Sequence, residues 1–215
     1  MKSKFNKNSR NLLIEMLLGD GTISNNNIYK LSHSYKQRDY LEWKIKQLNE
    51  AGIRHTEIKS YISSSGYNKG NEVIYTQLNT IPFIKVLRRV VYKNGNKYFS
   101  EKLLNRVSTK GIAIWYMDDG HINFRKNNGK ICGFYIKLSI CKSKEYIQTI
   151  IDFFKKQYDI NFYSFHEGKQ ADSYSICCGT KEGIKFIELV KPYVAQVPSM
   201  LHKITYDLTQ RKHNL

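Results

Sequence analysis

Cysteine is scarce in this chain of 215 residues, which contains only Cys132, Cys141, Cys177 and Cys178. No two of them have the C-x-x-C spacing of a zinc site. Neighbours along a strand, such as Cys177 and Cys178, point to opposite faces and are poorly placed to bind one metal ion. The sequence therefore argues against zinc and predicts free thiols, as in a reducing compartment.

Long hydrophobic runs are missing as well. Every apolar stretch is shorter than the roughly 20 residues that cross a bilayer, so no membrane partner is expected. The basic N-terminus, MKSKFNKNSR, has no apolar core behind it, which argues against a secretory signal and favours an intracellular location. With 41% hydrophobic and 25% charged residues, the composition is that of a folded protein.

Acidic residues are few: 18 Asp and Glu stand against 35 Lys and Arg, a formal net charge of +17. Such a charge attracts polyanions. A membrane surface is the less favoured polyanion, because the lysines are spread along the chain rather than gathered on one amphipathic helix. They are interleaved with 16 tyrosines, which can stack on or hydrogen-bond to nucleic acid. Nucleic acid is the expected partner.

An internal repeat organises the chain. Residues 29–53, YKLSHSYKQRDYLEWKIKQLNEAGI, match residues 136–160, IKLSICKSKEYIQTIIDFFKKQYDI, in the order of their features. Each segment reads as a K-L-S strand, a polar turn and a helix that includes a tyrosine near its start. A fainter match joins residues 75–92 and 174–194. Each repeat therefore has the order helix, strand pair, helix, strand pair, helix.

The repeats predict two domains, residues 1–104 and 105–215. Residues 98–110 link them and contain neither proline nor a Gly/Ser tract, which predicts a short and partly helical link. Alternating polarity between turn residues predicts the strands. In the first repeat they are Thr22–Ile23, Ile28–Ser34, Thr56–Ser63 and Val73–Asn79. In the second they are Ile122–Phe124, Gly133–Cys141, Phe162–His166 and Tyr174–Cys178.

Two apolar runs end abruptly in an acidic residue and a glycine: LLIEMLLGDG from Leu12 and IAIWYMDDG from Ile112. A helix that is apolar all round must be buried all round. We therefore expect the two helices to pack against each other between the repeats, which would bring Asp20 and Asp119 together at their C-terminal ends.

Each of these aspartates faces the negative end of a helix macrodipole, which costs about a few tenths of a kcal/mol. The same unfavourable placement in both repeats indicates a compensating cation. Paired carboxylates are typical ligands of Mg²⁺, which would bridge them to a phosphate. Alignment of the two runs through their final Asp-Gly selects Asp119 as the ligand and leaves Asp118 as a flanking acid.

The runs LIEMLLGDG (residues 13–21) and IAIWYMDDG (residues 112–120) resemble the paired motifs of the LAGLIDADG homing endonucleases, in their single-chain, two-repeat form. The W-x-M-D-D-G wording of the second run is similar to that of the omega-type mitochondrial intron endonucleases. The order of elements extends the resemblance over nearly the whole chain. One departure is Glu15, which stands where the family has a small residue and bears on how closely the helices pack there.

The resemblance implies an α+β fold: two pseudo-symmetric αββαββα repeats that form a saddle of two antiparallel sheets, joined by a two-helix interface. It implies a monomer that reads the major groove of double-stranded DNA and cuts both strands across the minor groove, leaving short 3′ overhangs. Mg²⁺ would be the cofactor, with Mn²⁺ substituting and Ca²⁺ supporting binding without cleavage. Homing of an intron or intein would place the protein in a mitochondrion or a bacterial cytoplasm.

The resemblance also implies the site residues. A lysine near the end of each repeat's last helical region, Lys97 or Lys203, would stabilise charge or order water at the scissile phosphate. Together with these lysines, Asp20 and Asp119 form the implied catalytic set. The implied metal site comprises Asp20, Asp119, Gly19 and Asp118.

Alternate side chains of a strand share a face, and this rule predicts the rows that read DNA. In the first repeat the predicted rows are Lys30, Ser32 and Ser34, and Lys59, Tyr61 and Ser63. In the second repeat they are Lys137 and Ser139, and Ser164 and His166. Because the rows differ between repeats, we expect a long and at most weakly palindromic target.

Other functions fit parts of the sequence. Glu57-Ile-Lys59 has the E-x-K pattern of another nuclease class, but it has no twin in the second repeat. An RNA maturase that assists intron splicing and a DNA-binding regulator that has lost cleavage both fit the resemblance. Retention of Asp20 and Asp119 favours the enzyme. A structural ribosomal or chromatin protein fits the charge but leaves the acidic helix ends unexplained.

Overall fold

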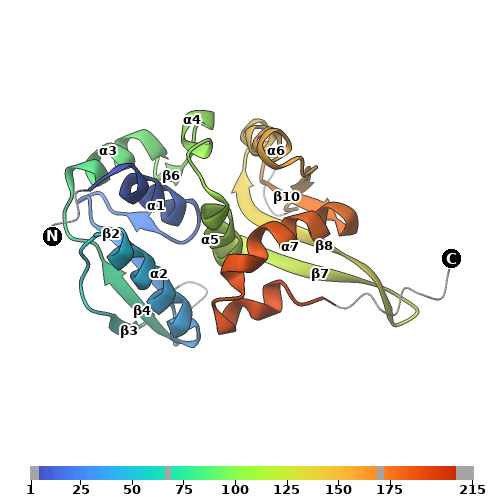
Figure 1. Cartoon of the computed structure of the whole chain (residues 1–215), viewed down its shortest axis with the longest axis horizontal. Coiled ribbons are helices and arrows are strands. Elements are labelled where there is room, and N and C mark those ends of the chain that lie inside the picture. Colours follow the sequence, from blue (N-terminus) through green and yellow to red (C-terminus); the bar gives the residue numbers. More distant parts are fainter. Residues whose placement is uncertain (1–4, 66–68, 169–171, 207–215) are drawn as a thin grey trace. The chain divides into compact units, whose positions relative to one another are not determined.

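The computed structural model describes residues 5–65, 69–168 and 172–206, which divide into two compact units (Figure 1). Unit 1 comprises Met1–Trp115 and Gln196–Ser199, and unit 2 comprises Tyr116–Ala195 and Met200–Leu215. The division falls inside helix α5 (Thr109–Asp119). The domain boundary predicted at residues 104 and 105 separates sequence repeats rather than compact units, and it stays a prediction.

Unit 1 is built around a four-stranded antiparallel sheet with the strand order β1-β2-β4-β3. Helix α2 packs against β2 and so covers one face of this sheet. The elements are α1 (Lys7–Leu18), β1 (Thr22–Ile23), β2 (Tyr29–Ser34), η1 (Tyr35–Gln37), α2 (Arg38–Glu50), β3 (Lys59–Ile62), β4 (Glu72–Gln77), α3 (Pro82–Val91), β5 (Tyr92–Lys93), β6 (Asn96–Lys97) and α4 (Glu101–Leu104).

Unit 2 repeats this plan with a sheet of the order β7-β8-β10-β9, again antiparallel. Helix α6 packs on β9 and β10, and α7 packs on β8 and β10. The elements are β7 (Gly120–Asn127), β8 (Lys130–Lys142), α6 (Lys144–Tyr158), β9 (Tyr163–His166), β10 (Tyr174–Gly179) and α7 (Thr180–Val194). The last element, η2 (Pro198–Lys203), crosses from unit 1 to unit 2.

The predicted strands are all confirmed, with ends that shift by a few residues. The hairpin between β7 and β8 turns at Asn128 and Gly129, whose φ angles of +48° and +77° suit these two residue types. Helix α4 confirms the predicted partly helical link. The turn-rich runs SSSGYNKGN (residues 63–71) and HEGKQAD (residues 166–172) also predict hairpin tips, and these include residues 66–68 and 169–171, which lie outside the described residues.

The two apolar runs form α1 and α5, and both helices are buried as predicted. In α1 the side chains of Leu13, Ile14, Met16 and Leu17 have no exposed surface. An Asn6–Ser9 capping box begins α1, which satisfies donors that the first helical turn leaves open. Among the described residues, no helix is both long and apolar enough to cross a bilayer.

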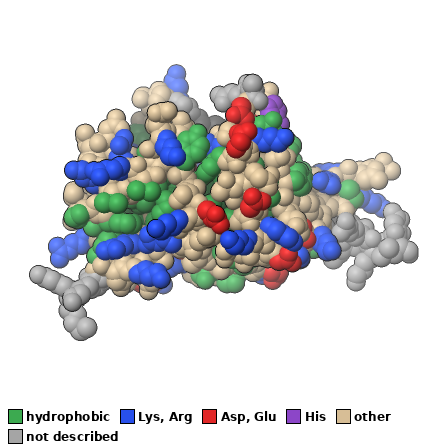
Figure 2. Space-filling view, turned by 90° about the horizontal axis from the view of Figure 1, so that it is seen from above, with side chains coloured by type: hydrophobic (Ala, Val, Ile, Leu, Met, Phe, Trp, Pro, Cys, Tyr) green, Lys and Arg blue, Asp and Glu red, His purple; other side chains and the backbone are tan. Residues whose placement is uncertain are grey.

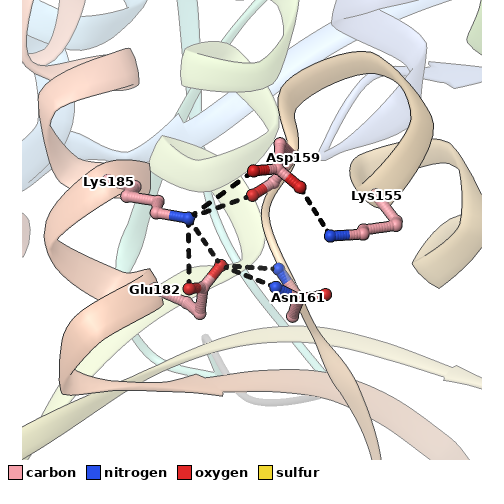
Figure 3. Close-up of polar contacts among 5 residues, drawn as sticks. All are labelled: Lys155, Asp159, Asn161, Glu182 and Lys185. Atoms are coloured by element: carbon pink, nitrogen blue, oxygen red, sulfur yellow. Dashed lines mark hydrogen bonds and ion pairs between the residues drawn. The ribbon is translucent and has the colours of Figure 1, made fainter.

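A polar network joins the two helices that cover the sheet of unit 2 (Figure 3). Helix α6 ends at Asp159, which adopts the left-handed conformation at φ +51° and pairs with Lys155 of the last turn. Lys185 of α7 reaches both Asp159 and Glu182, and Glu182 accepts a hydrogen bond from the backbone N–H of Asn161. This network links the end of α6 to the first turns of α7.

Candidate active site and nucleic-acid interface

Asp20 lies just past the C-terminal end of α1, and its side chain is 45% exposed. Gly21, the next residue, donates its N–H to the Met16 carbonyl at 3.1 Å. A Cβ at Gly21 would overlap that carbonyl, so close backbone approach rather than a left-handed conformation requires glycine here. The Asp-Gly pair therefore folds tightly back on its helix and leaves the carboxylate accessible.

The equivalent pair in unit 2 follows the same rule. Helix α5 ends at Asp119, and Gly120 begins β7 directly. A Cβ at Gly120 would overlap the Tyr116 ring and carbonyl, so this position also requires glycine. Asp118 and Asp119 are both half-buried. Asp20 and Asp119 belong to different units, and their convergence at one site stays a prediction.

The two lysines predicted from the family pattern both contact the end of a motif helix. Lys97 donates from its Nζ to the carbonyls of Leu17 at 2.9 Å and Gly21 at 3.1 Å, and also to the carbonyl of Gly19. The last carbonyls of a helix have no partner within the helix and carry its negative dipole end. Lys97 therefore compensates the end of α1 in unit 1.

Lys203 does the same in unit 2, where its side chain is only 9% exposed. Its Nζ donates to the carbonyls of Met117 at 2.5 Å and Tyr116 at 3.4 Å. In return, the Tyr116 hydroxyl donates to the Lys203 carbonyl at 2.6 Å, and burial raises the pKa of this hydroxyl. Each helix end therefore has a compensating ammonium of its own.

This finding changes the reading of Gly19. Its carbonyl oxygen accepts a hydrogen bond from the Lys97 ammonium, which makes it a poor ligand for a second cation. We therefore keep Asp20 and Asp119, flanked by Asp118, as the proposed metal-binding carboxylates.

Asp20 also contacts a buried polar pair that the sequence reasoning missed. His33 Nδ1 lies 3.5 Å from Asp20 Oδ2, and His33 Nε2 lies 3.1 Å from Lys44 Nζ. Since an ammonium can only donate, Nε2 must accept, and the ring proton of neutral His33 then sits on Nδ1, toward Asp20. Both residues are buried, at 5% and 0% exposed.

A signal for this pair exists in the sequence. His33 alternates with Ser32 and so shares the buried row of Leu31, and Lys44 lies on the helical face of Leu41 and Leu48. Polar residues at such positions need buried partners. The repeat counterparts, Ile140 and Ile150, are apolar, so the pair is specific to unit 1.

Glu15 occupies the position where the family has a small residue, and the structure gives it a role. It is 3% exposed, and its Oε1 accepts the backbone N–H of Ser108 at 2.9 Å, just before α5 begins. A carboxylate at a helix N-terminus is favourable. Room for it comes from Gly111, where a Cβ would overlap the Glu15 side chain. The larger residue on α1 is thus matched by the smallest residue on α5.

The face of each sheet opposite its packed helices, here called the open face, carries the predicted reading rows. In unit 1, Lys30 and Ser32 alternate with the buried Tyr29, Leu31 and His33, as predicted. The register adds neighbours to this face, because Lys59 and Ser32 both lie opposite Tyr75. The open-face positions of unit 1 are Lys30, Ser32, Ser34, Lys59, Tyr61, Tyr75 and Gln77. Ser63 lies just beyond β3.

In unit 2 the register agrees with one predicted row and contradicts the other. Lys137 and Ser139 alternate with the buried Ile136 and Leu138, so they belong to the open face. Ser164 lies opposite Ile176, which is fully buried and itself lies opposite Leu138.

Ser164 and His166 therefore belong to the covered row, and the prediction that they share a face with Lys137 is wrong. Tyr163, which lies opposite Cys177, takes the open face together with Phe165. A shift of one residue along a strand exchanges its two faces, and this was the error.

Further open-face residues of unit 2 were missed. Some, such as His121 and Arg125, lie outside the predicted strands, and others, such as Tyr135 and Tyr163, lie inside them but were left out of the predicted rows. The missed residues are His121, Asn123, Arg125, Tyr135, Tyr163, Phe165 and Glu167. Burial, followed by the charges of Lys137 and Lys203, lowers the pKa of His121, which is therefore neutral at pH 7. Lys and Arg side chains are spread over the surface seen in Figure 2, with fewer Asp and Glu among them.

A solved structure shares this fold. The structure of the homing endonuclease I-WcaI bound to its DNA recognition sequence matches with a TM-score of 0.72, covering 95% of this chain and 88% of that one at 21% identity. The profile of the LAGLIDADG DNA endonuclease family matches residues 10–186. The chain therefore belongs to the LAGLIDADG DNA endonuclease family.

Curated relatives are proteins named RecA. The one from Mycolicibacterium chitae is 27% identical over 205 residues, and the one from Mycolicibacterium flavescens is 29% identical over the same length. Each match takes in 90% of this chain but only 45% of the relative. The chain thus spans less than half the length of these relatives.

Proposed function

We propose that the chain is a site-specific DNA endonuclease that makes a double-strand break by metal-dependent hydrolysis of phosphodiester bonds. One observation carries the proposal beyond family membership. Each unit ends an apolar helix in Asp-Gly, and each supplies a lysine to that helix end. The ammonium offsets the helix carbonyls, and the neighbouring Asp-Gly carboxylate supplies oxygen atoms of the kind that a divalent cation binds.

The donor set fits a hard divalent cation. Asp20 and Asp119 offer carboxylate oxygens, the ligands that Mg²⁺ and Ca²⁺ take in proteins. Asp20 is partly exposed, so a cation can reach it together with a phosphate. Bound there, such an ion would activate water and stabilise charge on the scissile phosphate. We propose Mg²⁺, with Mn²⁺ substituting and Ca²⁺ supporting DNA binding without cleavage.

The open faces supply the surface for double-stranded DNA. Their lysines, serines and aromatic residues can hydrogen-bond to base edges and phosphates or stack on bases. The two faces carry different residues, which favours a long and weakly palindromic target. Because one chain holds both repeats, we propose that a monomer binds the whole site.

The partial match to RecA proteins favours one genetic setting. A homing endonuclease carried by an intein within a host protein would match only part of that host's length, as observed here. We therefore favour homing of an intein over homing of an intron, in a bacterial cytoplasm. Maturase activity on intron RNA and loss of cleavage remain the alternative functions, and retention of both aspartates argues for the enzyme.

The test is cleavage of a randomised double-stranded DNA library in Mg²⁺, followed by sequencing of the cut ends. The proposal predicts one long motif, short 3′ overhangs and no cutting in EDTA or in Ca²⁺. Binding of intron RNA without any cut DNA would favour the maturase. Selective DNA binding without cleavage would favour the regulator.

A further inference from the structure

The two open faces hold a lysine at an equivalent place. Lys30 of β2 lies opposite Thr22, which follows Gly21 directly, and Lys137 of β8 lies opposite His121, which follows Gly120 directly. Each is therefore anchored one residue from the Asp-Gly pair of its own unit. The repeats differ in what surrounds this lysine.

In unit 1 the lysine sits between two aromatic rings. Its Nζ lies 4.8 Å from the ring centroid of Tyr61 and 4.3 Å from that of Tyr75. The two rings lie 5.8 Å apart at an interplanar angle of 68°. Cation–π contacts hold the ammonium in place without neutralising it. They also leave its N–H donors available to a DNA base. Lys30 therefore presents its N–H donors beside two aromatic rings rather than beside a carboxylate.

In unit 2 the equivalent lysine, Lys137, lies beside a carboxylate and a hydroxyl instead. Lys137 Nζ lies 2.7 Å from Glu167 Oε2, and its side chain and that of Glu167 are only 13% and 20% exposed. Glu167 Oε1 accepts a hydrogen bond from Ser175 Oγ, and Ser175 Oγ accepts one from the Ile140 N–H at 3.0 Å. Phe165 lies beneath the ammonium at 4.6 Å. Lys137 and Glu167 are here called the Lys137–Glu167 pair. Phe165 contacts the lysine of this pair, and Ser175 hydrogen-bonds to its glutamate.

The strand register makes the two sets correspond. Tyr61 lies opposite Val73 and Lys59 lies opposite Tyr75 in unit 1. In unit 2, the N–H of Glu167 bonds to the Ser173 carbonyl, while Phe165 lies opposite Ser175.

Glu167 and Ser175 therefore stand where Tyr61 and Tyr75 stand. Two aromatic rings in one repeat are replaced in the other by a carboxylate and by the hydroxyl that donates to it.

We propose that Glu167 is a specificity-determining residue of unit 2, which makes this unit read one base pair through a donor and an acceptor together. Lysine donates to guanine O6 or N7 in the major groove, and a carboxylate accepts from cytosine N4. The Lys137–Glu167 pair therefore suits both bases of one G·C pair, whereas Lys30 contacts guanine alone or a phosphate. This inference rests on the proposed function.

Two features keep Glu167 in the state that this reading needs. Burial raises its pKa, but the hydrogen bonds from Lys137 and Ser175 outweigh burial and leave the pKa below its usual value. The carboxylate is therefore ionised at neutral pH and can only accept. Its charge also offsets that of Lys137, so this lysine attracts phosphate less than Lys30 does.

The experiment compares cleavage of every single-base variant of the target by the parent, by Glu167→Gln and by Glu145→Gln. Glu145 is an exposed glutamate on α6 and serves as the matched change of charge. Glutamine keeps the shape of Glu167 but adds a donor, which suits adenine rather than cytosine. We expect discrimination at one base pair of one half-site to fall about tenfold or to shift toward A·T, with all other positions unchanged. The slope of log binding constant against log salt should steepen by about one phosphate contact.

Other results would overturn the inference. An unchanged profile would show that Glu167 reads no base, and an equal loss at all positions would show that it acts through folding or through phosphate alone. Ser175→Ala, which removes the support of the carboxylate, should weaken the same base-pair preference in a second, independent variant. If the parent cuts no DNA at all, the proposed function fails together with the inference. If the parent cuts DNA and Glu167→Gln has the same cleavage profile over the single-base variants, only the inference fails.

Discussion

Substitution of Lys203 by methionine tests how the helix ends are stabilised. The change removes a buried ammonium and keeps an unbranched side chain of similar length. Lys203 Nζ donates to the Tyr116 and Met117 carbonyls. A buried polar group left without a partner costs about 1–3 kcal/mol, and the substitution leaves two such carbonyls. Burial of the apolar methionine side chain offsets part of this cost. We therefore expect the free energy of unfolding to fall by about 2–4 kcal/mol.

Urea unfolding followed by circular dichroism measures this loss. With a typical slope of about 2–3 kcal/mol per molar urea, the midpoint should fall by about 1–2 M. Lys191→Met is the matched control, because Lys191 is 58% exposed on α7 and should change stability by less than about 0.5 kcal/mol. If Lys203→Met leaves the midpoint unchanged, the carbonyl contacts do not stabilise the fold. A loss of cleavage without any loss of stability would assign Lys203 to the phosphate instead.

Three further predictions follow from the packing and from the titrating groups. Gly111→Ala should destabilise unit 1 by about 1–3 kcal/mol in urea, because the new methyl overlaps Glu15, and Glu15→Ala in the same chain should recover part of that loss. Burial raises the pKa of Cys177 to about 11 and that of Cys178 to about 12, so a thiol reagent at pH 8 should label only the other two cysteines until urea is added. His121 has a lowered pKa in the folded state, so the unfolded chain binds more protons near pH 6. The free energy of unfolding should therefore fall as pH drops through about 6.5, and less so in His121→Asn.

Local patterns predicted much of the fold. The strands follow from alternating polarity, and the two buried helices follow from runs that are apolar on every side. Gly21 and Gly120 each follow an aspartate in the sequence, and the structure supplies the reason in the overlap that a Cβ would cause there. These features are set by residues that lie close together in the sequence, so one sequence is enough to predict them.

Features that depend on strand register were harder to predict. Ser164 and His166 were assigned to the wrong face because the register of β9 is set by its pairing with β10. An irregularity lies between Tyr174 and Ile176, and Cys141 adopts a φ of +54° in β8. Such a bulge displaces one row relative to the next, and alternation alone cannot locate it.

Long-range polar partners were also beyond the sequence. The family resemblance selected Lys97 and Lys203, but only the structure shows that both donate to helix carbonyls. The His33–Lys44 pair joins a strand to a helix, and the sequence does not show that these two residues contact each other. Hydrogen bonds of this kind depend on tertiary packing, so the sequence can name the residues but not the contacts they make.

The most direct test of the proposed endonuclease is cleavage of its selected DNA target by Asp20→Asn and by Asp119→Asn. Asparagine keeps the shape of each side chain and removes the charge that would hold a divalent cation. We expect double-strand cleavage in Mg²⁺ to fall by orders of magnitude in each single variant, with DNA binding in Ca²⁺ retained and Asp118→Asn less affected. Near-parental cleavage by either single variant would contradict the two-aspartate site.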